Sequence, residues 1–248
     1  MRWTKPRNHS VTPLVVAVLW LPGLAASAAV PASARELGGI RLGMTMEELK
    51  AAAVARQPPL TLEKPETAPI PGQPGKTFPV SLKARSYAGQ QPSDFEEFDI
   101  TFSAPPLVPR VVRINHLAGS SEAKAPSKAR LQKTLRDKFG GPPARGYPGW
   151  VWRADGTPAR ADEAENCLIG HDSQGTWLRG YDRQPQVVLE RIKDTSTTCG
   201  LVAVASPRDP RLVSITITDF AALAEALAKG IELVKGAPAA AGPAGTPR

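Results

Sequence analysis

The chain has 248 residues, of which 42% are hydrophobic and 22% charged, and its formal net charge at pH 7 is +8. This length suffices for one larger domain or two small ones. Arg2, Lys5 and Arg7 supply three of the positive charges, which leaves +5 on the rest of the chain. Because this excess is small and not clustered, the composition argues against a nucleic-acid partner.

The first 34 residues have the pattern of an export signal, with a basic start followed by an apolar stretch over 11–24. Two small-residue sequences then fit a cleavage site: Ala26-Ser27-Ala28 and Ala32-Ser33-Ala34. The apolar stretch contains prolines and is short for a membrane span, so an uncleaved anchor is the less favoured alternative. We predict a signal peptide over 1–34, a mature N-terminus at Ala29 or Arg35, and a periplasmic or secreted protein without a transmembrane segment.

After the leader, the sequence predicts one helix and three strands. Thr45 and Glu48 form a capping box that begins a helix over 45–56, whose buried stripe is predicted to contain Leu49, Ala53 and Val54. Residues 58–79 contain seven prolines and are predicted to be an exposed extended loop. Strands are predicted where apolar and polar residues alternate, at 80–87, 95–102 and 110–117.

The following part of the chain repeats this order. A helix is predicted over 127–139, and Trp150-Val151-Trp152 is typical of a short strand. Residues 154–186 are polar and are predicted to be an irregular insertion. The remaining predicted elements are strands at 187–192, 200–205 and 212–218, a C-terminal helix capped by Asp219, and a disordered tail over 237–248.

Two segments share a local pattern as well as this order. Residues 102–115 and 204–216 both contain a proline-rich hairpin followed by Pro-Arg-(Val/Leu)-Val-x-Ile. Such repetition predicts a duplicated α+β fold, with two related units over 35–118 and 119–236. Each unit would pack a short helix on an antiparallel sheet of about three strands, and the second would add the C-terminal helix.

The sequence Leu42-Gly43-Met44-Thr45-Met46-Glu47-Glu48-Leu49 resembles the entry of the BamE-like outer-membrane lipoproteins and the related β-lactamase inhibitory protein. Gly140-Gly141-Pro142 followed by Trp150 and Trp152 is similar to their helix end and Trp-bearing strand. The resemblance implies helices packed on one face of an antiparallel sheet and, for the inhibitory protein, a tandem duplication with a free face that recognises a partner. Unlike the lipoproteins, this chain lacks a lipidated cysteine. Its layout is also similar to exported bacterial proteins of unknown function.

Cys167 and Cys199 are the two cysteines of the chain. An even number in an oxidising compartment favours a disulfide. Closing a loop with a separation of 32 residues is worth roughly 3–4 kcal/mol on the chain-entropy model. A metal site of Cys167, His171 and Cys199 is the alternative, but a fourth ligand and paired short spacing are missing. We predict the disulfide, and neither a metal nor a cofactor.

No catalytic motif stands out, and we predict that the protein is not an enzyme. His171-Asp172-Ser173 contains the residue types of a catalytic triad, but adjacent residues do not generally converge as nucleophile, base and orienting group. His116 is interpreted as a hydrogen-bonded residue at the edge of the core. The acidic run at 162–166 is interpreted as a solvated loop rather than a calcium site, because it lacks alternating oxygen ligands.

The sequence thus indicates a soluble, non-catalytic protein-binding module of the bacterial cell envelope, with another envelope protein as its partner. The predicted binding residues are Tyr87 and Trp177 on an open sheet face, with Lys133 and Arg136 of the basic helix at its rim. Trp150 and Trp152 are expected in the core, with a recognition platform as the alternative. Two other functions stay open: an accessory protein that binds an anionic surface through the basic helix, and, least favoured, a hydrolase.

Overall fold

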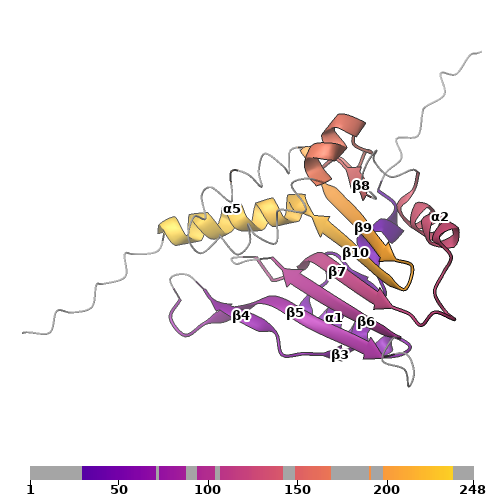
Figure 1. Ribbon diagram of the computed structural model, residues 1–248. Helices are drawn as coiled ribbons and strands as arrows, with labels where there is room; N and C mark the ends of the chain where they lie inside the picture. Colours follow the sequence, from indigo (N-terminus) through magenta and orange to yellow (C-terminus); the bar gives the residue numbers. More distant parts are fainter. Residues whose placement is uncertain are drawn as a thin grey trace, which may run out of the picture.

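The computed structural model describes residues 30–70, 73–87, 94–103, 107–141, 149–168, 190 and 198–236. These residues form an α+β fold built on one antiparallel sheet of eight strands, shown in Figure 1. The strands run in the order β3-β5-β6-β7-β10-β9-β8, and β4 pairs with β5 beside β3. Their bounds are β3 Thr61–Leu62, β4 Glu66–Pro69, β5 Thr77–Tyr87, β6 Phe95–Phe102, β7 Val111–Gly119, β8 Gly149–Trp152, β9 Leu201–Asp209 and β10 Leu212–Asp219.

The helices begin where the sequence supplies a cap. α1 (Met46–Ala55) starts at Thr45, whose hydroxyl accepts from the Glu48 amide while the Glu48 carboxylate accepts from the Thr45 amide at 2.8 Å. α2 (Lys128–Phe139) starts at Ser127. α5 (Phe220–Gly236) starts at Asp219, which accepts from the Ala222 amide at 2.9 Å. Side-chain caps satisfy amides that have no partner within the helix, so all three predicted starts are confirmed.

One face of the sheet is apolar and lies under α1 and α2. A row of buried side chains crosses six strands on this face: Leu82, Ile100, Ile114, Ile217, Ala203 and Trp150. Leu49 of α1 and Phe139 of α2 are fully buried in the same core. The rings of Phe139 and Trp150 lie 4.9 Å apart, and the Trp150 indole donates to the Gly141 carbonyl. The expectation that Trp150 and Trp152 belong to the core is therefore confirmed.

The chain enters this core before its first helix. A short 3₁₀ helix, η1 (Ala32–Arg35), leads into the two-stranded ribbon of β1 (Glu36–Leu37) and β2 (Ile40–Arg41). Ala34, Leu37 and Ile40 are almost completely buried against the α1–α2 side of the sheet. The segment from Val30 onward is thus part of the folded body.

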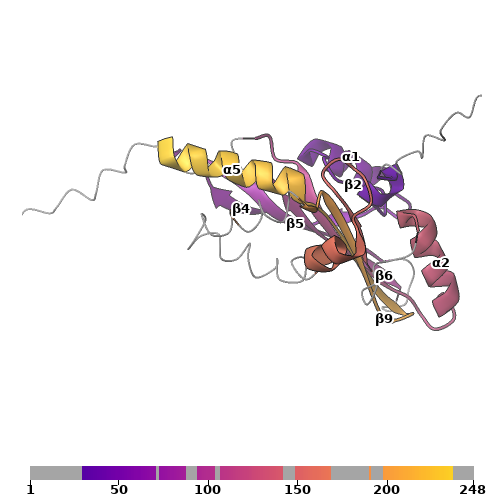
Figure 2. The same ribbon diagram turned by 90° about the horizontal axis from the view of Figure 1, so that it is seen from above.

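A smaller core lies on the opposite face, behind β8 and β9. Val151, Val202 and Phe220 pack there against a helix at residues 161–168. Figure 2 shows this helix and α2 on opposite sides of β9. Cys167 and Cys199 are both buried in this core, and their sulfur atoms form a disulfide with a Cα–Cα distance of 5.9 Å, as predicted.

Several sequence predictions need correction. Residues 58–79 do not form only an exposed loop, because β3 and β4 pair with β5 and Leu60 is buried. The insertion predicted at 154–186 contains the helix at 161–168. Val54, expected in the buried stripe of α1, is 76% exposed.

The sheet is also continuous where two separate sheets were expected. β10 pairs with β7 over seven residue pairs, so strands from both halves share one sheet. Only residue 190 of the strand predicted at 187–192 is described. His171, Trp177, the tail and residues 1–29 lie outside the described residues. Among the helices that are described, none has the length and apolar character needed to cross a membrane.

Candidate functional site

The face of β5, β6, β7 and β10 that points away from α1 and α2 is rich in polar side chains, and we call it the polar face. Strand pairing places two polar rows on it: Ser81, Thr101, Arg113 and Thr218, then Lys83, Asp99, Asn115 and Thr216. Both rows continue into β9 as valines, at Val202 and Val204. The polar face therefore borders directly on the core that holds the disulfide.

Asn115 lies at the centre of the polar face and is fixed by its neighbours. Its Oδ1 accepts hydrogen bonds from Ser214 at 3.1 Å and from Thr216 at 3.0 Å, both on β10. Cross-strand hydroxyl bonds of this kind hold the amide in one orientation. The side-chain oxygen is occupied, so what Asn115 has left to offer a ligand is its NH₂ group, a hydrogen-bond donor.

Arg113 lies two residues before Asn115 on the same face. Its Nε is buried and has no hydrogen-bond partner among the described residues. Burial lowers the pKa of Arg113, and the charge of Asp99 partly opposes this effect. A buried donor without a hydrogen-bond partner is unfavourable, and the planar donors of a guanidinium match a carboxylate. Arg113 is thus prepared to receive an anionic group.

Apolar side chains line one end of the polar face. The aligned positions are Tyr87, Phe95, Gly119 and Leu212. Gly119 has no side chain, and a Cβ there would lie 2.3 Å from the Phe95 ring, so this ring stands directly over the β7 backbone. Tyr87 is 62% exposed and Leu212 is 38% exposed. Aromatic anchors beside charged groups are typical of protein-recognition surfaces.

The outer edge of the polar face carries a small charge network. Arg85 Nε lies 3.3 Å from Glu63 and 3.6 Å from the opposing Glu97. Lys83 and Asp99, which face each other on neighbouring strands, are both exposed. Exposed pairs contribute little to stability, because water screens them, but they steer charged partners.

The structure separates the residues that the sequence placed on one surface. Tyr87 lies on the polar face, whereas Lys133 and Arg136 are exposed on α2, which packs against the opposite side of the sheet. Lys133 forms an ion pair with Asp137 at 2.6 Å. The basic helix is therefore not the rim of the face that carries Tyr87. Trp177 falls outside the described residues.

His116 lies at the edge of the main core in a polar cluster with Glu96 and Arg56. Its Nε2 is 3.2 Å from Glu96 Oε1, and its ring stacks on Phe98 at 4.3 Å, which confirms its assignment to the core edge. Arg56 pairs with the other oxygen of Glu96 and lies over the Phe98 ring. The hydrogen bond from His116, with help from Arg56, lowers the pKa of Glu96 to about 2. The cluster joins α1 to β6 and β7, so its evident role is structural.

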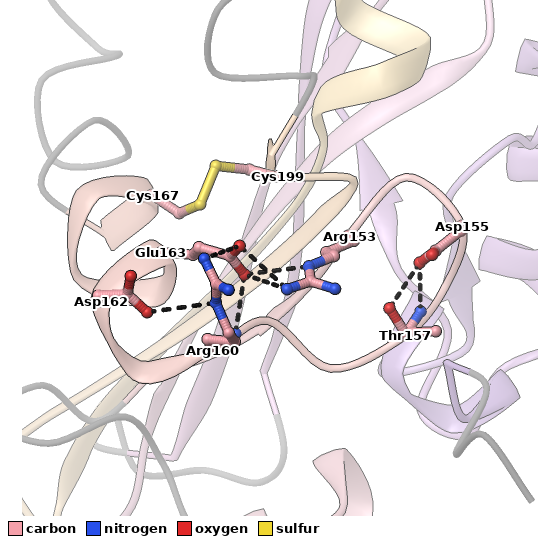
Figure 3. Close-up of polar contacts among 8 residues, drawn as sticks. All are labelled: Arg153, Asp155, Thr157, Arg160, Asp162, Glu163, Cys167 and Cys199. Atoms are coloured by element: carbon pink, nitrogen blue, oxygen red, sulfur yellow. Dashed lines mark hydrogen bonds and ion pairs between the residues drawn. A yellow bond between two sulfur atoms is a disulfide. The ribbon is translucent and has the colours of Figure 1, made fainter.

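The acidic run near the disulfide has a structural use that the sequence did not reveal. Figure 3 shows Arg153 and Arg160 converging on Glu163. Arg153 binds both oxygens of Glu163, with Nη2 at 2.8 Å from Oε2 and 3.0 Å from Oε1, and this contact raises the pKa of Arg153. Glu163 also accepts from the Arg160 amide at the helix start. The run is thus helical rather than a loop, and the part of the chain that the structure describes holds no group of three metal-binding side chains.

A shallow cavity of about 450 Å³ opens between the start of α1, β4, β5 and the segment before β7. Its walls include Phe78, Pro79 and Val108, which is 63% exposed. Thr45 also lines it, but the hydroxyl of this residue already caps α1. The cavity is thus a place for an apolar contact.

No protein-family model, curated protein or solved structure matches the chain. The candidate site therefore rests on the geometry of the polar face.

Proposed function

We propose that this chain is an exported, non-catalytic protein-binding module of the bacterial cell envelope that docks its partner on the polar face. One observation carries the proposal. One side of the sheet is filled by α1, α2 and the N-terminal segment, whereas the other side keeps an exposed tyrosine, exposed charges and an unpaired arginine between β5 and β7. Such a surface has the composition of an interface core with a charged surround.

The side chains of the polar face indicate which chemical groups the partner presents. Arg113 and the NH₂ group of Asn115 are donors that lie two residues apart on β7, so a carboxylate from the partner fits between them. Tyr87 and Phe95 offer an apolar strip on the same face. The partner is expected to present an acidic side chain beside an apolar patch. Electrostatic attraction would then set the register while the aromatic contact supplies affinity.

The resemblance to the BamE-like and β-lactamase-inhibitory proteins is part of the same proposal. In the first half of the sheet α1 precedes β5, β6 and β7, with the short strands β3 and β4 at the outer edge of β5, and in the second half α2 precedes β8, β9 and β10. β7 and β10 lie side by side. This arrangement supports a duplication of one helix–sheet unit.

A second candidate function rests on α2. The helix carries five basic residues and one acidic residue, Asp137, and its polar side is exposed. A surface with this charge attracts anionic lipid headgroups or cell-wall polymers. The protein would then act as an envelope-assembly or cell-wall-associated accessory, and binding would weaken steeply with added salt.

Two matched double variants separate these functions. Lys83→Glu with Tyr87→Ala changes the polar face, and Lys133→Glu with Arg136→Glu changes α2. All four side chains are exposed, so both variants should keep the wild-type unfolding midpoint. The partner is identified by crosslinking in intact cells and mass spectrometry, and its affinity for each purified variant is then measured.

We expect the polar-face variant to lose at least tenfold in affinity for the captured envelope protein and the α2 variant to bind like wild type. Loss in the α2 variant alone, with salt-sensitive sedimentation on anionic vesicles or cell wall, would instead establish the accessory function. Turnover of an ester or cell-wall substrate by a protein that captures no partner would refute both.

A further inference from the structure

The N-terminal segment at residues 30–35 is built into the fold. Ala34 has no exposed surface and lies in the main core. Ser33 Oγ donates to the Lys138 carbonyl at 2.8 Å, which ties η1 to the end of α2. The Arg35 guanidinium pairs with Asp219 at 3.1 Å, and the Arg35 carbonyl accepts from the Leu42 amide. The segment therefore links α2, β2 and the start of α5.

The two residues before η1 also contact the folded body. Val30 lies beside Gly156, since a Cβ there would be 3.6 Å from Val30 Cγ2. Pro31 lies beside Gly140, where a Cβ would also be 3.6 Å from the Pro31 ring. The Pro31 carbonyl accepts from the Ala34 amide and closes the 3₁₀ turn. Packing against the body thus begins at Val30 and not at Arg35.

The two candidate cleavage sites differ in what they would leave behind. Cleavage after Ala34 would remove a fully buried residue, the Ser33 hydrogen bond and the contacts of Val30 and Pro31. Cleavage after Ala28 would keep all of them.

We propose that a signal peptidase cleaves this chain between Ala28 and Ala29, so that the mature protein starts one residue before the folded body. Water adds across the peptide bond: its oxygen joins the Ala28 carbonyl carbon, and the nitrogen leaves as the α-amine of Ala29. Ala26 and Ala28 supply the small side chains that the peptidase requires. This inference rests on the export that is part of the proposed function.

The test is the N-terminus of the full-length gene product in the periplasmic fraction, measured by intact mass and N-terminal sequencing. Wild type should begin at Ala29. Ala28→Lys blocks the upstream site, and precursor should accumulate. Ala32→Lys is the matched control, because Ala32 is exposed in the fold and its replacement blocks only the downstream site. This variant should still begin at Ala29.

An N-terminus at Arg35, or loss of processing in Ala32→Lys alone, would overturn the inference and leave export intact. Recovery of only the uncleaved chain in the cytoplasm would overturn export itself. A second measurement is independent of the peptidase. Chains produced from Ala29 and from Arg35, both with the disulfide formed, should differ in thermal unfolding midpoint, with the shorter chain lower by about 5 °C or more. Equal midpoints would show that the fold does not need residues 29–34, which would overturn the structural basis for cleavage at Ala28.

Discussion

Arg113→Met is expected to stabilise the protein while it weakens partner binding. The buried Nε of Arg113 has no hydrogen-bond partner among the described residues. A buried donor left unsatisfied costs about 1–3 kcal/mol. Methionine has a similar length and keeps the packing of the side-chain stem, but it removes the charge and the donors. Allowing for imperfect packing, we expect the free energy of unfolding to rise by about 1 kcal/mol and the midpoint by about 2–4 °C.

The assay compares urea unfolding and partner affinity for wild type, Arg113→Met and Lys83→Met. Lys83 lies on the same face but is exposed, so Lys83→Met should leave stability unchanged within about 0.5 kcal/mol. If Arg113 receives a carboxylate of the partner, Arg113→Met should weaken binding by about 2 kcal/mol or more, which is roughly 30-fold. A function that depends on a destabilising residue gives this combination of more stability and less binding.

Destabilisation of Arg113→Met by about 1 kcal/mol or more would refute the reasoning, because the guanidinium would then have a stabilising partner in the folded protein. Unchanged affinity with raised stability would show that Arg113 is unpaired but not an anchor. In that case the binding surface would have to be assigned to Tyr87 and Phe95 without it.

Two further predictions concern stability. Replacing Cys167 and Cys199 together by serine should lower the free energy of unfolding by about 3–4 kcal/mol, which denaturant titration measures. Amide hydrogen exchange should rise first at residues 161–168. A uniform rise over the whole chain would show that the disulfide does not stabilise this helix locally. The folded-state pKa of Glu96 is about 2 against an ordinary 4.5, so its contribution to stability is complete above pH 4.5 and is lost as the pH falls toward 2. Glu96→Gln should therefore flatten the acid limb of stability against pH, and Glu97→Gln serves as the control; an unchanged acid limb in Glu96→Gln would contradict the assignment.

Local patterns predicted local structure well. The capping box of Thr45 and Glu48 set the start of α1, and Phe95–Phe102 had the predicted bounds of β6, because a cap and an alternating strand depend on residues near in sequence. The Cys167–Cys199 pair was predictable from the number of cysteines and the inferred compartment. The alternation along β7 also showed that Arg113 and Asn115 lie on the face opposite Ile114, which was the available signal for the polar face.

Pairings between distant segments were not predictable in this way. The sequence suggested two sheets, but β7 pairs with β10 across about a hundred residues, and only that register brings Asn115 to Ser214 and Thr216. β3 and β4 formed within the proline-rich stretch because β5 offered an edge for them to pair with. The helix at 161–168 has a polar sequence, and it is stabilised by Arg153 from outside and by the disulfide.

The amino-acid sequence was sufficient to predict the two helix–strand series, their caps, the disulfide and the two candidate cleavage sites. The folded chain was needed to show that the strands form one sheet, that Tyr87 and the basic helix lie on opposite sides of it, and that Ala34 belongs to the core. Helix caps and hydrophobic periodicity depend on neighbours within a few residues of the chain. The burial of a side chain, and the groups that surround a charged side chain, depend instead on which distant segment packs against it.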